Sequence, residues 1–395
     1  MWVGRAGFFC DQNPVPGLAT CRSGHGQTVT MRHVRIPAPI DVHVHLREPG
    51  YTHKEDILSG TQAALAGGFT AVLDMPNTAP PTATLAQWEE KRRRAAGKAV
   101  CDVGFFVGAV REAKVHEAAR TASYAVGLKV YVGETFGSLR IEDLGLLWAY
   151  MHTWPGPGPV AVHAEGVMLA AVIGLAAVTG TRVHVCHVSR RDEILLIRAA
   201  RERGLPITCE VTPHHLFLTQ EDLPRLGPYG HMRPPLATPA DRDALWDNLE
   251  VIDCFATDHA PHTREEKEGD NPPPGVPGLE TALPLLLTAV QEGRLTLAQL
   301  IERVCDRPRR IFGLSAPSDT FAEVEMGAPW TIGEEPFFTR AGWSPFAGMQ
   351  VRARVRRTVI RGREHYRDGQ VTVSPGAGRV LTPTGRLPAR PHSAE

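Results

Sequence analysis

The sequence predicts an α/β protein whose main domain is a (β/α)8 barrel of the TIM type, followed by a small C-terminal β appendage. Eight short apolar runs, rich in β-branched residues, recur between positions 40 and 258, and helical patterns separate most of them. Because the runs are nearly continuously apolar, they are typical of parallel strands covered by helices. Eight such units favour a closed barrel. The alternative is an open doubly wound sheet, but the Gly-rich phosphate loop usual after its first strand is absent.

The eight predicted strands follow one another at the spacing of β/α units. In chain order they are IDVHVH (40–45), FTAVLDM (69–75), CDVGFFV (101–107), GLKVYV (127–132), PVAVHA (159–164), RVHVCHV (182–188), PITCEV (206–211) and VIDCFATD (251–258). The first intervening helix is predicted over residues 53–66, because two glycines follow it and glycine commonly ends helices. Another helix is predicted between the N-cap candidate Ser189 and Gly204.

The composition and periodicity of the chain predict four segments. Residues 1–33 show no clear periodicity and are predicted to form a poorly ordered tail. Residues 34–315 contain the barrel pattern, and residues 316–375 alternate residue by residue, as antiparallel strands do. The polar, Pro-rich residues 376–395 are predicted to be a disordered linker or tail.

The overall composition excludes several classes of partner. Formal net charge is zero, so no general attraction to nucleic acid or to a membrane surface is expected. No apolar run reaches the length of a membrane-spanning helix, and the N-terminal residues do not resemble a signal peptide. Seven scattered cysteines fit free thiols in a reducing compartment, so a cytoplasmic location is expected.

Polar side chains gather at the carboxyl ends of the predicted strands, where barrel enzymes place their chemistry. His43 and His45 end the first strand, and their spacing points both rings to one face. His163, His187 and Asp258 end the fifth, sixth and eighth strands. A lone strand histidine is more often a hydrogen-bonded core residue than a ligand. Four histidines and an aspartate at one end of one barrel favour a zinc site.

Lys129 lies inside the fourth predicted strand, where an ammonium group is costly to bury. One interpretation is that the side chain reaches out to solvent or pairs with Glu134. The other is that burial favours the neutral amine, which can take up carbon dioxide. The resulting carbamate is a carboxylate that can bridge two metal ions. Both interpretations stay open at this point.

Several separate motifs resemble those of the dihydroorotases, in the metal-dependent amidohydrolase superfamily. They are DVHVHLREPG (41–50), MPNT (75–78), GLKVY (127–131), VHAE (162–165), HVCHVSR (184–190), CEVTPHHL (209–216) and ATDHAPHT (256–263). The resemblance runs from about residue 36 to residue 375 and is closest to the dihydroorotase domain of the animal multifunctional protein of pyrimidine synthesis. The phrases PGLETALPLLLTAVQEGRL and RPRRIFGL strengthen that comparison.

The resemblance implies two zinc ions bridged by a carbamylated lysine and a hydroxide, with an additional zinc beside them. The implied ligands are His43, His45 and Asp258 for the first zinc, His163 and His187 for the second, Lys129 for the bridge, and Cys186 and Glu210 for the additional zinc. Cys186 can equally be an inert, packed thiol. Asp258 is also implied to transfer a proton during the reaction.

The resemblance also implies a set of substrate contacts. The matching residues are Arg47, Asn77 and His262, which would hold the substrate carboxylate and ring, Arg233 and the backbone of Pro277 and Gly278 as further pocket candidates, and Thr135 and Phe136 on a loop that would close over the substrate. An arginine suits a carboxylate because its two parallel N–H groups can bind both oxygens.

The implied activity is the zinc-dependent, reversible cyclisation of N-carbamoyl-L-aspartate to L-dihydroorotate in pyrimidine synthesis. A homodimer is expected, and aspartate transcarbamoylase and carbamoyl-phosphate synthetase are expected as fused or associated neighbours. Related barrels with dihydropyrimidinase, hydantoinase or allantoinase activity are the alternative, and Arg47 favours a carboxylate-bearing substrate over theirs. A non-catalytic scaffold is a further alternative, which the retained ligands oppose. The chain departs from the family pattern over residues 1–33, at Thr257, where serine is usual, and at Asp306, where asparagine is common.

Overall fold

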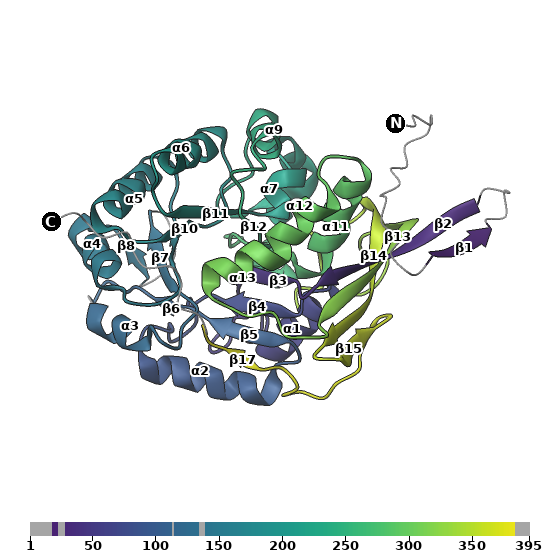
Figure 1. Ribbon diagram of the computed structural model, residues 1–395, viewed down its shortest axis with the longest axis horizontal. Helices are drawn as coiled ribbons and strands as arrows, with labels where there is room; N and C mark the ends of the chain where they lie inside the picture. The colour runs from purple at the N-terminus through teal and green to yellow at the C-terminus, as the bar shows by residue number, and fades with distance from the viewer. Residues whose placement is uncertain (1–17, 23–27, 113, 134–138, 384–395) are drawn as a thin grey trace.

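A computed structural model describes residues 18–22, 28–112, 114–133 and 139–383 of the chain (Figure 1). It contains two parallel sheets and one antiparallel sheet. The two parallel sheets, with helices outside them, form a TIM-barrel-type fold. Each of the eight predicted strand segments contains a strand, and the third is divided into two.

The parallel strands run in two consecutive sets. The first sheet has the order β17-β5-β4-β3, and the second has the order β12-β11-β10-β9-β7-β6, with β8 beside β7. A single residue, Phe106, separates β5 from β6, and a parallel bridge joins Val44 in β3 to His259 beyond β12. The strands are β3 (Ile40–Val44), β4 (Ala71–Asp74), β5 (Asp102–Phe105), β6 (Val107–Gly108), β7 (Leu128–Val132), β8 (Arg140–Ile141), β9 (Val160–His163), β10 (Val183–Val185), β11 (Ile207–Val211), β12 (Cys254–Phe255) and β17 (Val380–Leu381).

Helices connect these strands and cover them from outside (Figure 1). They are α1 (Ile57–Ala66), α2 (Leu85–Lys98), α3 (Val115–Thr121), α4 (Leu144–Thr153), α5 (Gly166–Thr179), α6 (Arg191–Glu202), α7 (Pro213–Phe217), α8 (Leu223–Leu226), α9 (Pro239–Asp247), α10 (Arg264–Glu268), α11 (Leu279–Gln291), α12 (Leu297–Ile301) and α13 (Arg307–Phe312), with short helical turns η1 (Gln220–Asp222), η2 (Gly227–Gly230) and η3 (Glu302–Asp306). The first helix begins later than the sequence predicts because Asp56 caps it, accepting from the Ser59 N–H.

The antiparallel sheet combines strands from both ends of the described chain. Its order is β1 (Leu18–Arg22), β2 (Thr28–Pro37), β13 (Phe321–Thr331), β14 (Gln350–Ile360), β15 (Arg363–Arg367) and β16 (Gln370–Val371). Figure 1 shows β2, β13 and β14 side by side next to the parallel strands. The alternating pattern of residues 316–375 therefore corresponds to antiparallel strands.

Two sequence-based predictions about the chain ends are wrong within the described residues. The structure places residues 18–22 and 28–33 in strands, where the sequence predicts a disordered tail, because β2 pairs with the distant strand β13. Residues 380–381 also form a strand, which pairs with β5 instead of belonging to a free tail. The remaining parts of those two predictions, residues 1–17, 23–27 and 384–395, lie outside the described residues.

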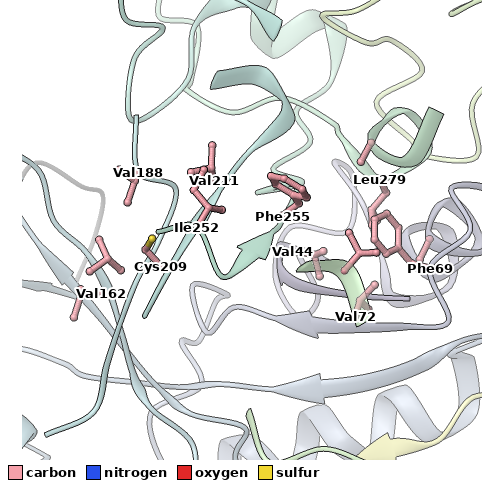
Figure 2. Close-up of a cluster of buried hydrophobic side chains, with 14 of the residues drawn as sticks. Val44, Phe69, Val72, Val162, Val188, Cys209, Val211, Ile252, Phe255 and Leu279 are labelled. Carbon is pink, nitrogen blue, oxygen red and sulfur yellow. The ribbon is translucent and has the colours of Figure 1, made fainter. Parts of the chain in front are cut away.

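The hydrophobic core lies on both faces of the parallel strands. Val160 and Val162 of β9 belong to the large cluster under the helices, whereas Ala161 between them belongs to a second cluster with Cys186. Figure 2 shows side chains of the large cluster converging from several strands and loops, including Val44, Val162 and Val211. Complete burial of such a side chain contributes about 1.5–3 kcal/mol, so the strands hold a rigid frame for the residues at their ends. Within the described residues, no helix combines the length and apolarity needed to cross a bilayer.

Candidate metal centre and active site

The carboxyl ends of the parallel strands deliver the predicted polar residues to one place, here called the mouth. His43 lies in β3, Lys129 in β7 and His163 at the end of β9. His187 follows β10 by two residues, and Asp258 follows β12 by three. All five side chains are buried. Because parallel strands end at the same edge, residues far apart in sequence meet there.

The first group at the mouth is built around one oxygen of Asp258. Nε2 of His43 lies 3.2 Å from Oδ1 of Asp258, and Nε2 of His45 lies 3.0 Å from the same atom. Burial alone would raise the pKa of Asp258, but His43 and His45 hold it well below its usual range. The ligand atoms of these three residues lie within 4.8 Å of one another. Two imidazoles and a carboxylate at this spacing fit a transition-metal ion such as zinc.

The second group is a pair of neutral imidazoles. Nδ1 of His163 lies 2.8 Å from Nε2 of His187, and the His187 ring lies 5.3 Å from the His43 ring. Burial, then the charge of Lys129, lowers the pKa of His163 to about 3, and burial lowers the pKa of His187 well below its usual value. Nδ1 of His187 is buried with no hydrogen-bond partner in the described structure. A buried, neutral, unpartnered imidazole nitrogen fits a metal ligand.

Lys129 is completely buried beside these histidines. Its Nζ lies 2.9 Å from Sγ of Cys186 and 4.9 Å from the centre of the Tyr131 ring. Within the described residues it has no carboxylate at ion-pair distance, and the alternative partner Glu134 lies outside them. A buried ammonium group without a counter-charge is unfavourable, and this is the position at which the resemblance implies a carbamate.

Glu210 of β11 lies behind His43. Its carboxylate accepts from Nδ1 of His43, from Nε2 of His184 at 3.0 Å, and from the His187 N–H at 3.2 Å. Burial alone would raise the pKa of Glu210, but His43 and His184 lower it. Glu210 in turn outweighs burial and raises the pKa of His43 to about 10. A carboxylate on the far nitrogen of a histidine fixes that ring for metal binding.

Sequence reasoning missed two buried residues of this network. His184, in β10, precedes Cys186, the residue after that strand, by two positions, and this spacing is the signal that could have placed both side chains on one face. Asp41 precedes His43 by two positions and accepts from the His43 N–H at 3.1 Å. The Thr257 hydroxyl donates to Asp41 at 2.5 Å, so threonine supplies at this position the hydroxyl that serine would.

The predicted metal ligands Cys186 and Glu210 also approach His43. Ligand atoms of these three buried residues lie within 4.8 Å of one another. The structure therefore brings the residues predicted for an additional zinc together, next to the first group, and His43 belongs to both.

The predicted substrate residues lie at the outer side of the mouth. Arg47 is buried, its Nε donates to the Pro261 carbonyl at 3.2 Å, and its Nη2 lies 3.1 Å from Nε2 of His262. Asn77 has its Oδ1 2.6 Å from Nδ1 of His45, which ties the substrate side to the first metal group.

The other predicted pocket residues have different positions. Arg233 is exposed. Burial and the charge of Lys129 are the main causes of the lowered pKa of His163, and the charge of Arg233 makes a smaller contribution in the same direction. The Gly278 N–H, next to Pro277, lies 3.2 Å from Nδ1 of His259, so this backbone donor is already engaged. The predicted loop residues Thr135 and Phe136 lie outside the described residues.

Three residues of the mouth adopt a backbone conformation that side chains rarely accept. The φ angles of Arg47, His187 and Asp258 are 61°, 35° and 46°. Left-handed backbone at residues other than glycine costs about 1–3 kcal/mol and persists where the surrounding structure enforces it. Its occurrence at three site residues agrees with a functional role for their orientation.

Comparisons with known proteins identify the class of the chain. A model of the amidohydrolase family matches residues 34–132. The solved structure of L-hydantoinase from Arthrobacter aurescens has a TM-score of 0.80 and 28% sequence identity, and the match covers 88% of each chain. With the site geometry, these matches place the chain among the amidohydrolases.

Two relatives define the family more closely. The multifunctional protein CAD of Squalus acanthias is 49% identical over 347 residues, which cover 88% of this chain but 15% of that protein. The dihydroorotase of Pyrococcus furiosus is 32% identical over 416 residues, which cover 95% of this chain and 94% of that protein. The chain belongs to the dihydroorotase family.

Proposed function

We propose that this chain interconverts N-carbamoyl-L-aspartate and L-dihydroorotate with zinc as its metal, the third step of pyrimidine (UMP) synthesis. The observation that carries the proposal is the convergence of His43, His45 and Asp258 with the pair of neutral histidines at one mouth. The similarity to dihydroorotases over most of the chain supports the substrate. The multifunctional relative is much longer than this chain, so its activities are not carried over beyond this step.

The metal centre would use residues from five strands or strand ends. His43, His45 and Asp258 would hold one zinc, His163 and His187 the second, with carbamylated Lys129 between them. The buried Lys129 amine without a counter-charge supports that modification. Cys186, Glu210 and His43 are the candidates for an additional zinc. When bound, zinc lowers the pKa of water and polarises a carbonyl oxygen.

Asp258 would move the proton of the reaction. In the hydrolytic direction its carboxylate would accept a proton from the attacking water and return it to the leaving amide nitrogen of the ring. Oδ1 of Asp258 lies 3.0 Å from Nε2 of His45, so the carboxylate stands at the proposed metal site, where the attacking water would be activated. The synthetic direction would use the same groups in reverse.

The substrate carboxylate would bind between Arg47 and His262, with Asn77 beside them. Arg47 is buried, and a charge-assisted contact is strong where water is excluded. Arg233 and the backbone at Pro277 and Gly278 would border the pocket, and Thr135 and Phe136 would close over it. These assignments rest on the resemblance of the motifs.

A hydantoinase-type activity is the second candidate, because the L-hydantoinase structure matches the fold closely. The buried Arg47, with His262 beside its Nη2, favours a carboxylate-bearing ring over a neutral one. A non-catalytic scaffold is the third candidate, and the presence of every proposed metal ligand opposes it.

We also propose how the barrel closes, how the chain assembles and where it is located. The bridge from Val44 to His259 would complete a closed (β/α)8 barrel, with the six-stranded sheet as its appendage. A homodimer is proposed, and apolar Trp148 and Val167, exposed on the neighbouring helices α4 and α5, support it. Aspartate transcarbamoylase and carbamoyl-phosphate synthetase would be neighbours, fused or associated. Five buried free cysteines in the described structure support a cytoplasmic location.

The test is hydrolysis of L-dihydroorotate by the purified chain supplied with zinc, followed by ultraviolet absorbance. Turnover in the wild type and its loss in Lys129→Ala are expected. Dihydrouracil and hydantoin serve as substrates without a carboxylate. Turnover of these rings alone would contradict the proposed substrate, and no turnover of any of them at full zinc content would favour the scaffold.

A further inference from the structure

Lys54 lies beside the proposed site for the substrate carboxylate. Its ammonium group limits which nitrogen of His262 can carry the proton. The lysine sits in the turn after Tyr51, and its side chain is 15% exposed. Its Nζ lies 3.2 Å from Nδ1 of His262 and 2.9 Å from Oε1 of Glu266. His262 is buried, and Arg47 lies on its opposite nitrogen, Nε2, at 3.1 Å.

The two nitrogens of His262 allow two arrangements of hydrogen bonds. An ammonium group can only donate, so a bond from Lys54 requires a lone pair on Nδ1 and leaves the proton on Nε2. That proton can reach the Pro274 carbonyl at 3.1 Å. In the other arrangement, Nδ1 donates to Glu266 at 3.3 Å, and Nε2 accepts from Arg47.

The arrangements differ in what they offer an anion. With the proton on Nε2, His262 and Arg47 are two neighbouring donors, and a carboxylate oxygen can bind both by replacing the Pro274 carbonyl as the acceptor of the His262 proton. With the proton on Nδ1, the lone pair of Nε2 faces the same space and repels a carboxylate. Burial lowers the pKa of His262, and the charges of Arg47 and Lys54 lower it further, so the ring stays neutral. Which of its two nitrogens carries the single proton therefore decides whether the site can bind a carboxylate.

We propose that Lys54 is a positioning residue that holds His262 in its Nε2–H form and so creates a two-donor site for the substrate carboxylate. Lys54 does this directly, by donating to Nδ1, and indirectly, by pairing with Oε1 of Glu266 and so offsetting the charge of the carboxylate whose Oε2 is the competing acceptor. This inference rests on the proposed function, because it concerns how the same site selects a carboxylate.

The kinetic test compares Lys54→Met with Lys54→Arg. Lys54→Met should raise KM for dihydroorotate roughly 10- to 100-fold, with kcat little changed. The reason is that Nε2 of His262 would lose its proton and with it one hydrogen bond to the charged substrate carboxylate. Lys54→Arg should retain most of the affinity, since arginine also only donates. Lys114→Met, which removes an exposed lysine on the loop before α3, is the control and should leave both constants unchanged. An unchanged KM in Lys54→Met would overturn the proposal.

The spectroscopic test reads the proton position directly and needs no turnover. The chain is labelled with ¹⁵N-histidine, and the His262 signals are assigned with His262→Asn. The wild type should show a protonated Nε2 and an unprotonated Nδ1, and Lys54→Met should shift the proton toward Nδ1. A wild-type ring protonated on Nδ1, or a proton position unaffected by Lys54→Met, would contradict the inference. Absence of dihydroorotate turnover in the wild type would instead count against the proposed function, and the proton position would still decide the role of Lys54.

Discussion

The six-stranded sheet and the mouth of the parallel strands are both rich in polar and charged residues, but the two regions differ in how those groups are paired. On the sheet, carboxylates meet arginines across strands, as in Glu323 with Arg35 at 3.4 Å and Glu364 with Arg357 at 2.8 Å. At the mouth, Nδ1 of His187 and the Tyr131 hydroxyl are buried without a partner in the described structure. Paired charges suit an exposed surface, whereas buried polar groups without a partner, next to a cluster of possible metal ligands, agree with a site that a ligand completes.

The largest expected effect is on the reaction rate, and it comes from a residue of the mouth. Asp258→Ala should lower the rate of dihydroorotate hydrolysis at least ~10²–10⁴-fold, because a general acid–base group is lost. The rate is measured at saturating substrate, and bound zinc is determined in the same sample. Near-normal turnover at unchanged zinc content would show that Asp258 has no part in the reaction.

A buried ion pair near the mouth should contribute far more to the free energy of unfolding than any ion pair on the six-stranded sheet. Lys91 of α2 and Asp74 of β4 are completely buried, with Nζ and Oδ2 2.6 Å apart. Lys91→Met should lower the free energy of unfolding by about 3–5 kcal/mol, because it leaves a carboxylate buried and unpaired. Urea unfolding measures the change.

The double variant Asp74→Asn/Lys91→Met is the matched control for that prediction. It removes both charges while Asn keeps an oxygen for the Leu46 N–H, which now donates to Asp74 at 2.8 Å. The double variant should recover part of the lost stability. A double variant as unstable as Lys91→Met alone would show that packing, and not charge, dominates at this position.

The contact between the sheet and the parallel strands should depend on pH. His365 of β15 is buried, with Nδ1 2.6 Å from the Val100 carbonyl, and burial lowers its pKa. The unfolded chain therefore takes up a proton near pH 6.5 that the folded chain excludes, so this stability is present above that pH and is lost as the pH falls. His365→Asn keeps a donor for Val100 and removes the titration.

The stability advantage of the wild type over His365→Asn should thus shrink as the pH falls from 7.5 to 5.5, by up to about 1 kcal/mol per pH unit. Urea unfolding of both proteins at three pH values checks the trend. Because the histidines of the mouth are common to both proteins, they cancel in the difference. A constant difference would mean that His365 titrates alike in the folded and unfolded chain.

The smallest effect is expected for the exposed pairs of the sheet. Glu323 contacts Arg35, whose side chain is 64% exposed, and Arg357. Glu323→Gln should change the free energy of unfolding by at most about 1 kcal/mol, because water and salt screen such pairs. A loss as large as that of Lys91→Met would erase the contrast between the two regions.

The sequence could predict the members of the mouth because they obey a local rule. His43, His163 and His187 all stand at or just beyond a strand end, and parallel strands end at one edge. The sequence could not show that Glu210 would pair with His43, since that contact depends on which strands lie opposite each other. The same holds for Lys54 and His262, whose proximity arises from two loops.

Long-range pairing also explains what the sequence did not reveal about the chain ends. Strand β2 alternates weakly, and its partner β13 lies almost at the other end of the described chain, so no nearby pattern indicates the pairing. Strand β17 has only two residues, too few for any periodic signal. Lys91 lies within a run of charged residues that is typical of an exposed helix face, which concealed its burial.

Zinc content is the most direct measure of whether the histidines and Asp258 of the mouth form a metal centre. The purified chain is supplied with zinc, dialysed against metal-free buffer and analysed by atomic emission. About two or more tightly bound zinc ions per chain are expected, with a clear loss in His187→Ala. A wild type that retains no zinc, or an unchanged zinc content in His187→Ala, would show that these residues do not form the metal centre.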